Sequence, residues 1–324
     1  MPEPAQFRVI QSGFLSTVQD LGRYGFQRFG MPVGGAMDIL ALRLGNRLVG
    51  NPDSAAVLEI TLQGPELTFE TDSVIALSGA DLSPTLNGNP VQNWTVMCVT
   101  RGSTLSFGER RNGARAYLAV AGGINVPLVL GSRSTHMRSR TGGFRGRALL
   151  KGDVLHGHPP SSDAWKSAGR ALPSAAHPSY SPDVTLRVVL GPQSDCFVPD
   201  APGTLVHGPY TISPQSDRMG YRLIGPPLPH ARAPDLISDA TPPGAVQVPA
   251  SHQPILLMAD RPTTGGYPKI AVVISADLPL AAQLVPGDCI RFSLIEVSEA
   301  RAIVRDQHAR LDVILPPVRP ANTP

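Results

Sequence analysis

Short apolar segments with period-two alternation recur through most of the chain, and each is bounded by Gly, Pro, Asn, Asp or Ser. Such segments predict β-strands that turn one face toward a core. The Asn87-Gly88 dipeptide predicts a tight hairpin turn, because both residues accept positive φ. The expected strands are residues 56–62, 67–70, 74–78, 96–100, 104–107, 116–120, 148–155, 185–190, 255–259, 270–275 and 289–295.

Helical periodicity is confined to a few places. Residues 38–49 begin with an aspartate suited to the N-cap and carry leucines at every fourth position. A second helix is expected over 298–309, and a shorter one over 277–284 with a proline in its first turn.

The composition supports a mainly β fold. The 32 glycines and 34 prolines make up about a fifth of the 324 residues, and both disfavour helix interiors. Residues 159–182 are rich in Pro, Ser and Ala without apolar periodicity, which predicts a linker or long surface loop. We therefore expect a β-rich N-terminal subdomain over 5–158 and a second β-rich subdomain over 183–315.

Charge and targeting signals narrow the function classes. The formal net charge of +3 argues against nucleic acid as the main partner. No apolar run is long enough to span a membrane, and the N-terminus lacks a signal-peptide pattern. We expect a cytoplasmic protein whose three scattered cysteines are reduced and buried.

The loop over residues 260–268 concentrates chemistry between two predicted strands, and it is longer than a tight hairpin requires. Its glycine pair is expected to take positive φ and to let a ligand approach the backbone amides. Such a loop suits a carboxylate, ureido or phosphate group, although an ordinary glycine-containing turn explains the same residues. The residues of interest are Asp260, Thr263, Thr264, Gly265, Gly266 and Tyr267.

A second candidate is the segment 216–223, where Asp217 and Arg218 are adjacent and Arg222 follows. Two guanidinium groups can bind a carboxylate through paired hydrogen bonds, with the aspartate orienting one of them. A structural Arg–Asp pair that fixes a turn is the alternative.

For three further motifs we prefer a structural role to a role in ligand or metal binding. Residues 19–23 combine an acid, a glycine and a base, which is typical of a fixed turn. Residues 131–135 offer hydroxyls and one arginine but have no helix start behind them, so the helix dipole gives no help with an anion. His156 and His158 share a strand face, yet no third metal ligand lies nearby, so we expect no metal.

Several chemical devices are absent from the sequence. There is no P-loop motif, no G-x-S-x-G elbow and no lysine between methionines that biotin could modify. No nucleophile and base occur at close spacing. The chain therefore offers binding groups without a complete catalytic apparatus.

Motifs in order along the chain resemble one known family. The sequence resembles the biotin-dependent carboxyltransferase family, which includes allophanate hydrolase subunit 2, KipA and the 5-oxoprolinase subunit PxpC. The matching motifs are Thr17–Arg23, Gly34–Asp38, Asn46, Gly50-Asn51, Gly131–Thr135, Gly142-Gly143, Gly191–Gln193, Ser216–Leu223, Gln247–Pro249, Thr263–Pro268 and Ala282-Gln283.

This resemblance implies two cyclophilin-like β-barrel subdomains and a subunit role in a multi-chain enzyme. The implied activity is the ATP-dependent opening of 5-oxoproline to glutamate, with a subunit-B-like (KipI/PxpB) chain and a subunit-A-like (LamB/YcsF) chain. The ATP site is expected to be unconventional or on a partner chain. We predict catalytic roles for Asp217, Arg218 and Asp260, and substrate binding by Arg222, Gln253, Thr263, Thr264, Gly265, Gly266, Tyr267 and Gln283.

Two alternatives stay open. The chain can be the carboxyltransferase subunit of a urea carboxylase or allophanate system, in which case biotin is involved on another chain. It can also be a non-enzymatic regulator of the KipA type, which binds a KipI-like partner.

Overall fold

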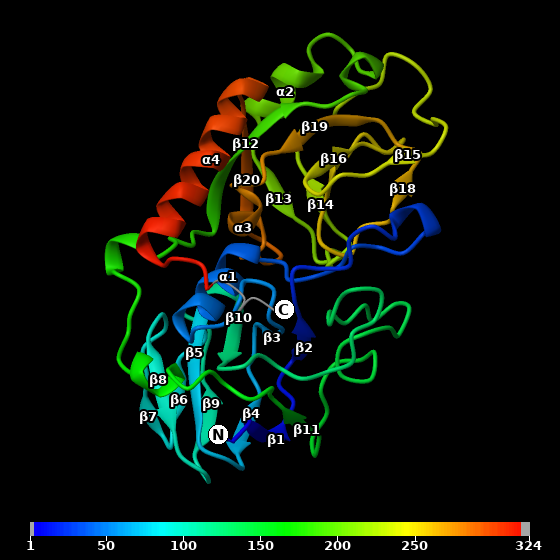
Figure 1. Cartoon of the computed structure of the whole chain (residues 1–324). Helices are drawn as coiled ribbons and strands as arrows, with labels where there is room; N and C mark the ends of the chain where they lie inside the picture. The colour runs from blue at the N-terminus through cyan, green and yellow to red at the C-terminus, as the bar shows by residue number, and fades with distance from the viewer. Residues whose placement is uncertain (1–2, 319–324) are drawn as a thin grey trace, which may run out of the picture. The chain divides into compact units, whose positions relative to one another are not determined.

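The computed structural model describes residues 3–318, which form two compact units. Figure 1 shows their strands and helices. Unit 1 comprises the residues up to Arg23, Gly34–Tyr180 and the residues from Arg310 onward. Unit 2 comprises Tyr24–Val33 and Ser181–Ala309. Residues 159–180, which the sequence marks as a linker or surface loop, thus belong to unit 1.

Unit 1 is built on two β-sheets. The six-stranded sheet has the order β11 (Val154–His156), β1 (Gln6–Gln11), β4 (Glu66–Phe69), β9 (Thr104–Phe107), β6 (Pro84–Leu86) and β7 (Asn89–Pro90). The five-stranded sheet has the order β2 (Leu15–Gln19), β3 (Val57–Thr61), β10 (Asn112–Val120), β5 (Ser73–Asp81) and β8 (Val96–Val99).

Alternating side chains of the five-stranded sheet enter two different cores. On β10, Leu118 packs in a cluster shared with the six-stranded sheet, whereas Tyr117 packs against helix α1 (Ile39–Leu48). Leu58 and Val57 divide in the same way on β3. Because both faces are covered, β3 and β10 are buried almost throughout, including polar residues such as Glu59 and Arg115.

The segment predicted as a linker or long surface loop is mostly exposed, and a few buried residues anchor it to unit 1. Ala164 and Leu172 are buried in the cluster on the α1 side of the sheet, and the indole of Trp94 lies 5.8 Å from the His177 ring. Its only regular pieces are the 3₁₀ turns η2 (Ala164–Ser167) and η3 (Ser174–Ala176). Apolar residues were too few and too irregularly spaced to reveal this packing.

Unit 2 contains a closed seven-stranded barrel. Its order is β12 (Asp183–Leu190), β19 (Lys269–Val273), β16 (Ala245–Gln247), β17 (Ile255–Leu257), β14 (Gly220–Ile224), β13 (Tyr210–Ile212) and β20 (Cys289–Leu294). The barrel closes through the parallel pairing of β12 with β20. A separate two-stranded ribbon pairs β15 (Asp239–Ala240) with β18 (Thr264–Gly265).

Helices α2 (Ala201–His207), α3 (Leu278–Ala281) and α4 (Val297–Ile314) follow unit 2 strands, and short 3₁₀ turns η1 (Gln27–Phe29) and η4 (Ser194–Cys196) complete it. Helix α4 runs five residues past the predicted end at 309, and its last residues belong to unit 1. No helix within residues 3–318 is long and apolar enough to cross a membrane.

The mainly β prediction is confirmed, and most of the expected strands and the helix over 38–49 lie within one or two residues of expectation. Several strands were not predicted, among them β1, β2, β13, β14 and β16. Of the strand expected over 148–155, only Val154–His156 and its pairing with β1 are present. Helix α2 was missed, because Pro202 and Gly203 within it are poor helix formers.

The three cysteines are free, as expected, but they are not all buried. Cys196 is buried, Cys289 is half-buried and Cys98 is exposed. Cys98 lies on β8, the last strand of the five-stranded sheet. The apolar alternation around it predicted a strand correctly but not which face the thiol occupies.

Candidate functional site

The chemistry-rich loop of unit 2 begins after β17 and ends at the first residue of β19. Within it, β18 pairs with β15, and the ribbon continues through hydrogen bonds from the Thr241 amide to the Thr263 carbonyl and from the Leu236 amide to the Gly266 carbonyl. The loop is therefore a structured ribbon against the barrel, and its residues are held in place.

The glycine pair is packed closely but does not take positive φ, so that part of the prediction was wrong. A Cβ on Gly265 would lie 2.8 Å from Nε2 of Gln247, and one on Gly266 would lie 3.0 Å from the Leu236 carbonyl oxygen. Glycine fits here because the ribbon packs closely, rather than because of a left-handed backbone.

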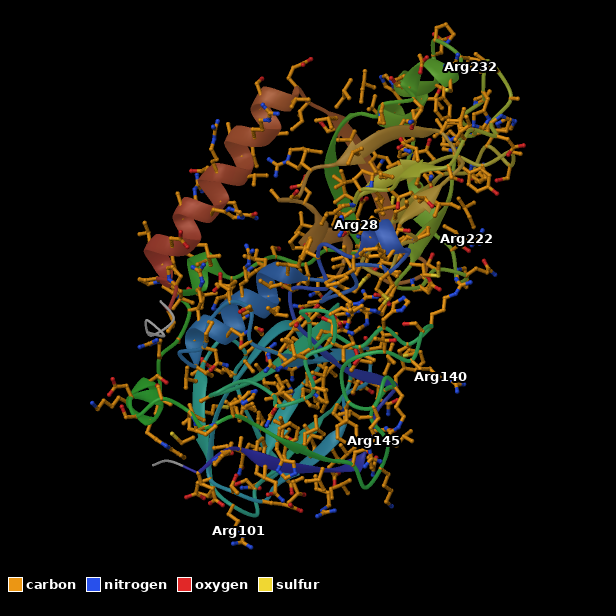
Figure 2. The ribbon with its side chains drawn as sticks, turned by 45° about the vertical axis from the view of Figure 1, so that its right-hand side comes forward. Arg28, Arg101, Arg140, Arg145, Arg222 and Arg232 are labelled. Atoms are coloured by element: carbon orange, nitrogen blue, oxygen red, sulfur yellow. The ribbon has the colours of Figure 1, made fainter. Side chains whose placement is uncertain are left out.

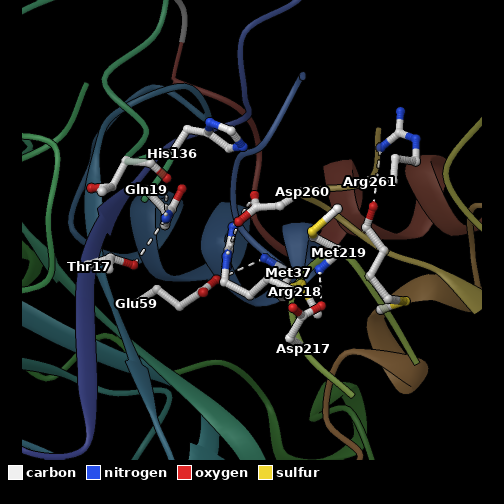
Figure 3. A network of polar contacts seen from close by, with 12 residues as sticks. Thr17, Gln19, Met37, Glu59, His136, Asp217, Arg218, Met219, Asp260 and Arg261 are labelled. Atoms are coloured by element: carbon white, nitrogen blue, oxygen red, sulfur yellow. Dashed lines mark hydrogen bonds and ion pairs between the residues drawn. The ribbon is translucent and has the colours of Figure 1, made fainter. Parts of the chain in front are cut away.

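Arg218 and Asp260 form a buried ion pair, 42 residues apart in sequence. The Arg218 Nε atom donates to Oδ2 of Asp260 at 2.9 Å, and a terminal nitrogen donates to Oδ1 at 3.1 Å. Figure 3 shows the two side chains facing each other. Both side chains are only 10% exposed, and the Asp260 amide also donates to the Arg218 carbonyl. This paired geometry fixes the guanidinium plane.

The side chains of Asp217 and Arg222 are not part of this ion pair. The Oδ1 atom of Asp217 accepts hydrogen bonds from the amides of Met219 and Gly220, so this exposed carboxylate fixes the turn before β14. Asp260 rather than Asp217 is the carboxylate that holds Arg218. The exposed Arg222 is on β14 and is labelled on the surface in Figure 2.

The other predicted residues are spread around the barrel. Gln253 exchanges two hydrogen bonds with the Gly225 backbone, at 3.0 and 3.1 Å. Because Gly220 pairs with Leu257 and Arg222 with Ile255, Gln253 lies at the opposite end of the β14–β17 pair from Arg218 and Asp260. Gln283 is buried, whereas Thr264 and Tyr267 are exposed and Thr263 is half-buried.

Arg261 is a buried cation that the sequence did not single out. Its Nε atom donates to the Thr241 carbonyl at 2.8 Å. Burial lowers the pKa of Arg261, while the neighbouring Tyr24 and Asp260 partly offset that effect. The signal was present in sequence, since Arg261 directly follows Asp260 in the loop.

Lys269 was also missed. Its side chain is 2% exposed and its ammonium lies 3.4 Å from a carboxylate oxygen of Asp239 on the ribbon. A backbone hydrogen bond to the Ala240 amide, followed by the Lys269 charge, lowers the pKa of Asp239. Gln193 links the two, because it accepts from the Lys269 amide and donates to Asp239. This cluster fastens the ribbon to the barrel.

In unit 1, the motifs at 19–23 and 131–135 meet each other. The Asp20 carboxylate accepts hydrogen bonds from the Ser132 and Ser134 hydroxyls and from the Arg133 amide. The buried Arg23 donates to the Ser134 carbonyl. The hydroxyls are thus engaged in holding the two loops together, as the structural reading of both motifs expects.

A second buried network in unit 1 surrounds Glu59. Its Oε2 atom accepts from the Tyr117 hydroxyl at 2.9 Å and from the Met37 amide at 2.8 Å, and Figure 3 includes the latter contact. Burial, followed by the charges of Glu59 and Asp38, raises the pKa of Tyr117 well above its usual value. The network positions the turn that leads into α1. No cluster of three or more potential metal ligands occurs among residues 3–318.

Comparison with known proteins places the chain in a family. The model of the carboxyltransferase domain, subdomains A and B, matches residues 29–294. The chain belongs to this carboxyltransferase family. The matched region includes the Arg218–Asp260 pair, the ribbon and the Glu59 network.

The similar proteins in this family include both a 5-oxoprolinase subunit and urea amidolyases. The chain is 39% identical over 300 residues to the C-type subunit of 5-oxoprolinase from Escherichia coli strain K12, covering 93% of this chain and 94% of that protein. It is 36% identical to the urea amidolyase of Lachancea kluyveri, with 96% of this chain covered but only 18% of that protein. The crystal structure of the K. lactis urea amidolyase matches 97% of this chain and 20% of that chain, with 34% identity and a TM-score of 0.89.

Proposed function

We propose that this chain is the C-type subunit of an ATP-dependent 5-oxoprolinase that opens 5-oxoproline to glutamate in the cytoplasm. The observation that carries the proposal is end-to-end similarity: the match covers 94% of the E. coli 5-oxoprolinase protein. By contrast, the chain spans less than a fifth of the urea amidolyase, whose remaining length has no counterpart here.

The barrel supplies groups for a small lactam. Opening an amide places negative charge on its carbonyl oxygen, and fixed donors near that atom lower the barrier. We assign this role to Arg218, whose plane Asp260 fixes at 2.9 and 3.1 Å. Asp217 holds the adjoining turn, and Thr263, Thr264 and Tyr267 are proposed to contact the substrate, together with Arg222, Gln253, Gln283 and the glycine pair.

The nucleotide is assigned to a partner chain. ATP would supply the driving force for ring opening, but the sequence has no P-loop. The chain therefore offers no conventional nucleotide motif, and we derive no step through ATP here. The partners are a subunit-B-like and a subunit-A-like chain. Biotin has no place in this reaction.

A second candidate is carboxyl transfer to urea from a biotin carrier, which the TM-score of 0.89 to a urea amidolyase favours. One experiment separates the two. The chain is combined with its subunit-A-like and subunit-B-like partners, and glutamate formation from 5-oxoproline and ATP is measured. A parallel reaction offers urea with a carboxylated biotin carrier. Turnover of 5-oxoproline supports the proposal, and carboxyl transfer to urea without glutamate formation overturns it.

A further inference from the structure

Helix α4 covers the barrel of unit 2 incompletely. It is 18 residues long, yet none of its described residues within unit 2 is buried, and its buried Leu311 belongs to the α1-side cluster of unit 1. Figure 1 shows α4 running beside β12. A helix of this length that hides so little of its surface leaves room for another binding partner.

A groove of about 520 Å³ lies between α4 and the barrel. Its floor includes Val189 of β12 and Val272 of β19, both half-buried, and Val304 of α4 forms part of its wall. Val297 at the start of α4 also lines it and is 50% exposed. Leu190 and Leu294, at the ends of the adjoining strands, are 49% and 46% exposed, so the apolar surface extends beyond the groove. Contiguous apolar surface of this kind marks interaction sites.

The rim of the groove is positively charged. Arg301 and Arg305 line it, are exposed and lie one helical turn apart. Within residues 3–318 neither side chain makes a hydrogen bond or ion pair. By contrast, Arg187 and Arg291 of the same unit form ion pairs with Asp277 and Asp183. Two unpaired cations beside an apolar groove complement a segment that carries both apolar and acidic side chains.

We infer that this groove binds an acidic, amphipathic segment of the subunit-B-like partner chain. The inference rests on the proposed function, which requires such a partner, and it assigns the partner a place on this chain. Apolar anchors three or four residues apart on the partner segment would enter the groove between α4 and β19, and its carboxylates would face Arg301 and Arg305. The apolar contacts would supply most of the affinity, and the rim charges would set orientation and association rate.

The test measures binding of the full-length chain to the subunit-B-like chain by isothermal titration calorimetry. Arg301→Glu/Arg305→Glu should weaken binding at least tenfold, and the loss should shrink at high salt because rim charges are screened. The matched control, Arg101→Glu/Lys151→Glu, makes the same charge change at exposed residues of unit 1 and should leave the dissociation constant unchanged.

A second pair of variants tests the apolar groove without changing charge. Ala300 lines the groove, whereas Ala302 is exposed on the same helix and does not. Ala300→Trp should fill the groove and weaken binding at least tenfold, while Ala302→Trp should not. Circular dichroism and melting temperatures establish that all variants are folded.

The outcomes separate this inference from the proposed function. If the partner binds all variants equally well, the groove is not its binding site, although the proposed function stands. If the complex forms through the groove but turns over urea instead, the inference stands and the proposed function fails. Failure of the wild-type chain to bind the partner overturns both. Self-association of the isolated chain that Ala300→Trp abolishes would identify a second copy as the occupant and overturn the inference.

Discussion

At the residue scale, the Arg218–Asp260 pair is the feature most sensitive to substitution. Both side chains are 10% exposed and share two hydrogen bonds. Removing one member of a buried pair leaves a charge with fewer compensating contacts and costs about 3–5 kcal/mol. We expect Asp260→Ala to lower the free energy of unfolding by that amount, measured by urea denaturation of the isolated chain.

The matched control is Asp217→Ala. Asp217 is exposed and accepts two backbone hydrogen bonds at a turn, so its loss should cost about 1 kcal/mol. If the two substitutions cost the same, the buried pair contributes no more to stability than an ordinary turn contact.

His230 predicts a dependence of stability on pH. Its Nε2 atom bonds the Val248 carbonyl at 3.0 Å, so Nδ1 is the unprotonated nitrogen of the neutral ring. Within residues 3–318 that Nδ1 is buried without a partner. The Phe197 and His252 rings lie tilted against the His230 ring, with centroid distances of 4.9 and 5.0 Å. Burial lowers the pKa of His230, offset in part by the Val248 contact and reinforced by His252.

The direction in which stability changes with pH follows from the difference in proton binding between the folded and unfolded chain. The folded-state pKa of His230 is below its unfolded value of about 6.5, so the unfolded chain binds more protons in that window. The stabilising contribution is present above about pH 6.5 and is lost as pH falls through the folded pKa. Thermal unfolding between pH 7.5 and 5.5 should show a falling melting temperature, and His230→Gln should flatten the profile. The exposed His207 provides the control: a His207→Gln profile as flat as that of His230→Gln would contradict this assignment.

Sequence reasoning at this scale identified both segments that form the buried ion pair, but not that they pair with each other. Residue types alone placed Asp260 and Arg218 in two candidate motifs, yet their pairing spans 42 positions and depends on the β14–β17 register. Lys269 and Arg261 were missed for the same reason: their burial depends on contacts with the ribbon, which are distant in sequence. Spacing also gave the wrong reason for Gly265, whose close neighbour is Gln247.

At the scale of elements, helix α1 depends on its N-cap. The Asp38 Oδ1 atom accepts from the Ala41 amide at 2.8 Å, and Oδ2 accepts from the Tyr180 hydroxyl at 3.2 Å. We expect Asp38→Ala to lower the free energy of unfolding by about 1–2 kcal/mol. Asp38→Asn keeps an oxygen acceptor at the cap and should retain most of that stability in the same denaturation assay. An equally large loss in both variants would show that the negative charge, and not the cap, is what matters.

Elements with a strong local signal were predicted well, and those that depend on tertiary packing were not. The aspartate and leucine spacing of α1 and the Asn87-Gly88 turn, with φ of 52° and 79°, act locally and were confirmed. Residues 159–180 carry no periodic pattern, so the burial of Ala164 and Leu172 could not be read from them.

At the scale of the whole molecule, the barrel of unit 2 offers buried cations and carboxylates, but the chain has neither a P-loop nor an evident nucleophile–base pair. Arg218, Arg261 and Lys269 are each held by contacts within unit 2, and we propose that they bind and orient the substrate rather than complete a reaction. We therefore expect the isolated chain to form no detectable glutamate from 5-oxoproline and ATP. Activity should appear when both partner chains are added.

The measurement is glutamate release by the chain alone, by each partner alone, and by every combination. An Arg218→Met/Asp260→Leu variant tests the role of the buried pair, since replacing both members by apolar residues of similar size avoids an uncompensated charge. That variant should assemble with the partners but restore less than about a hundredth of the activity, which is the scale of losing one well-placed donor. Full turnover by the isolated wild-type chain would mean that the catalytic apparatus is complete within these 324 residues.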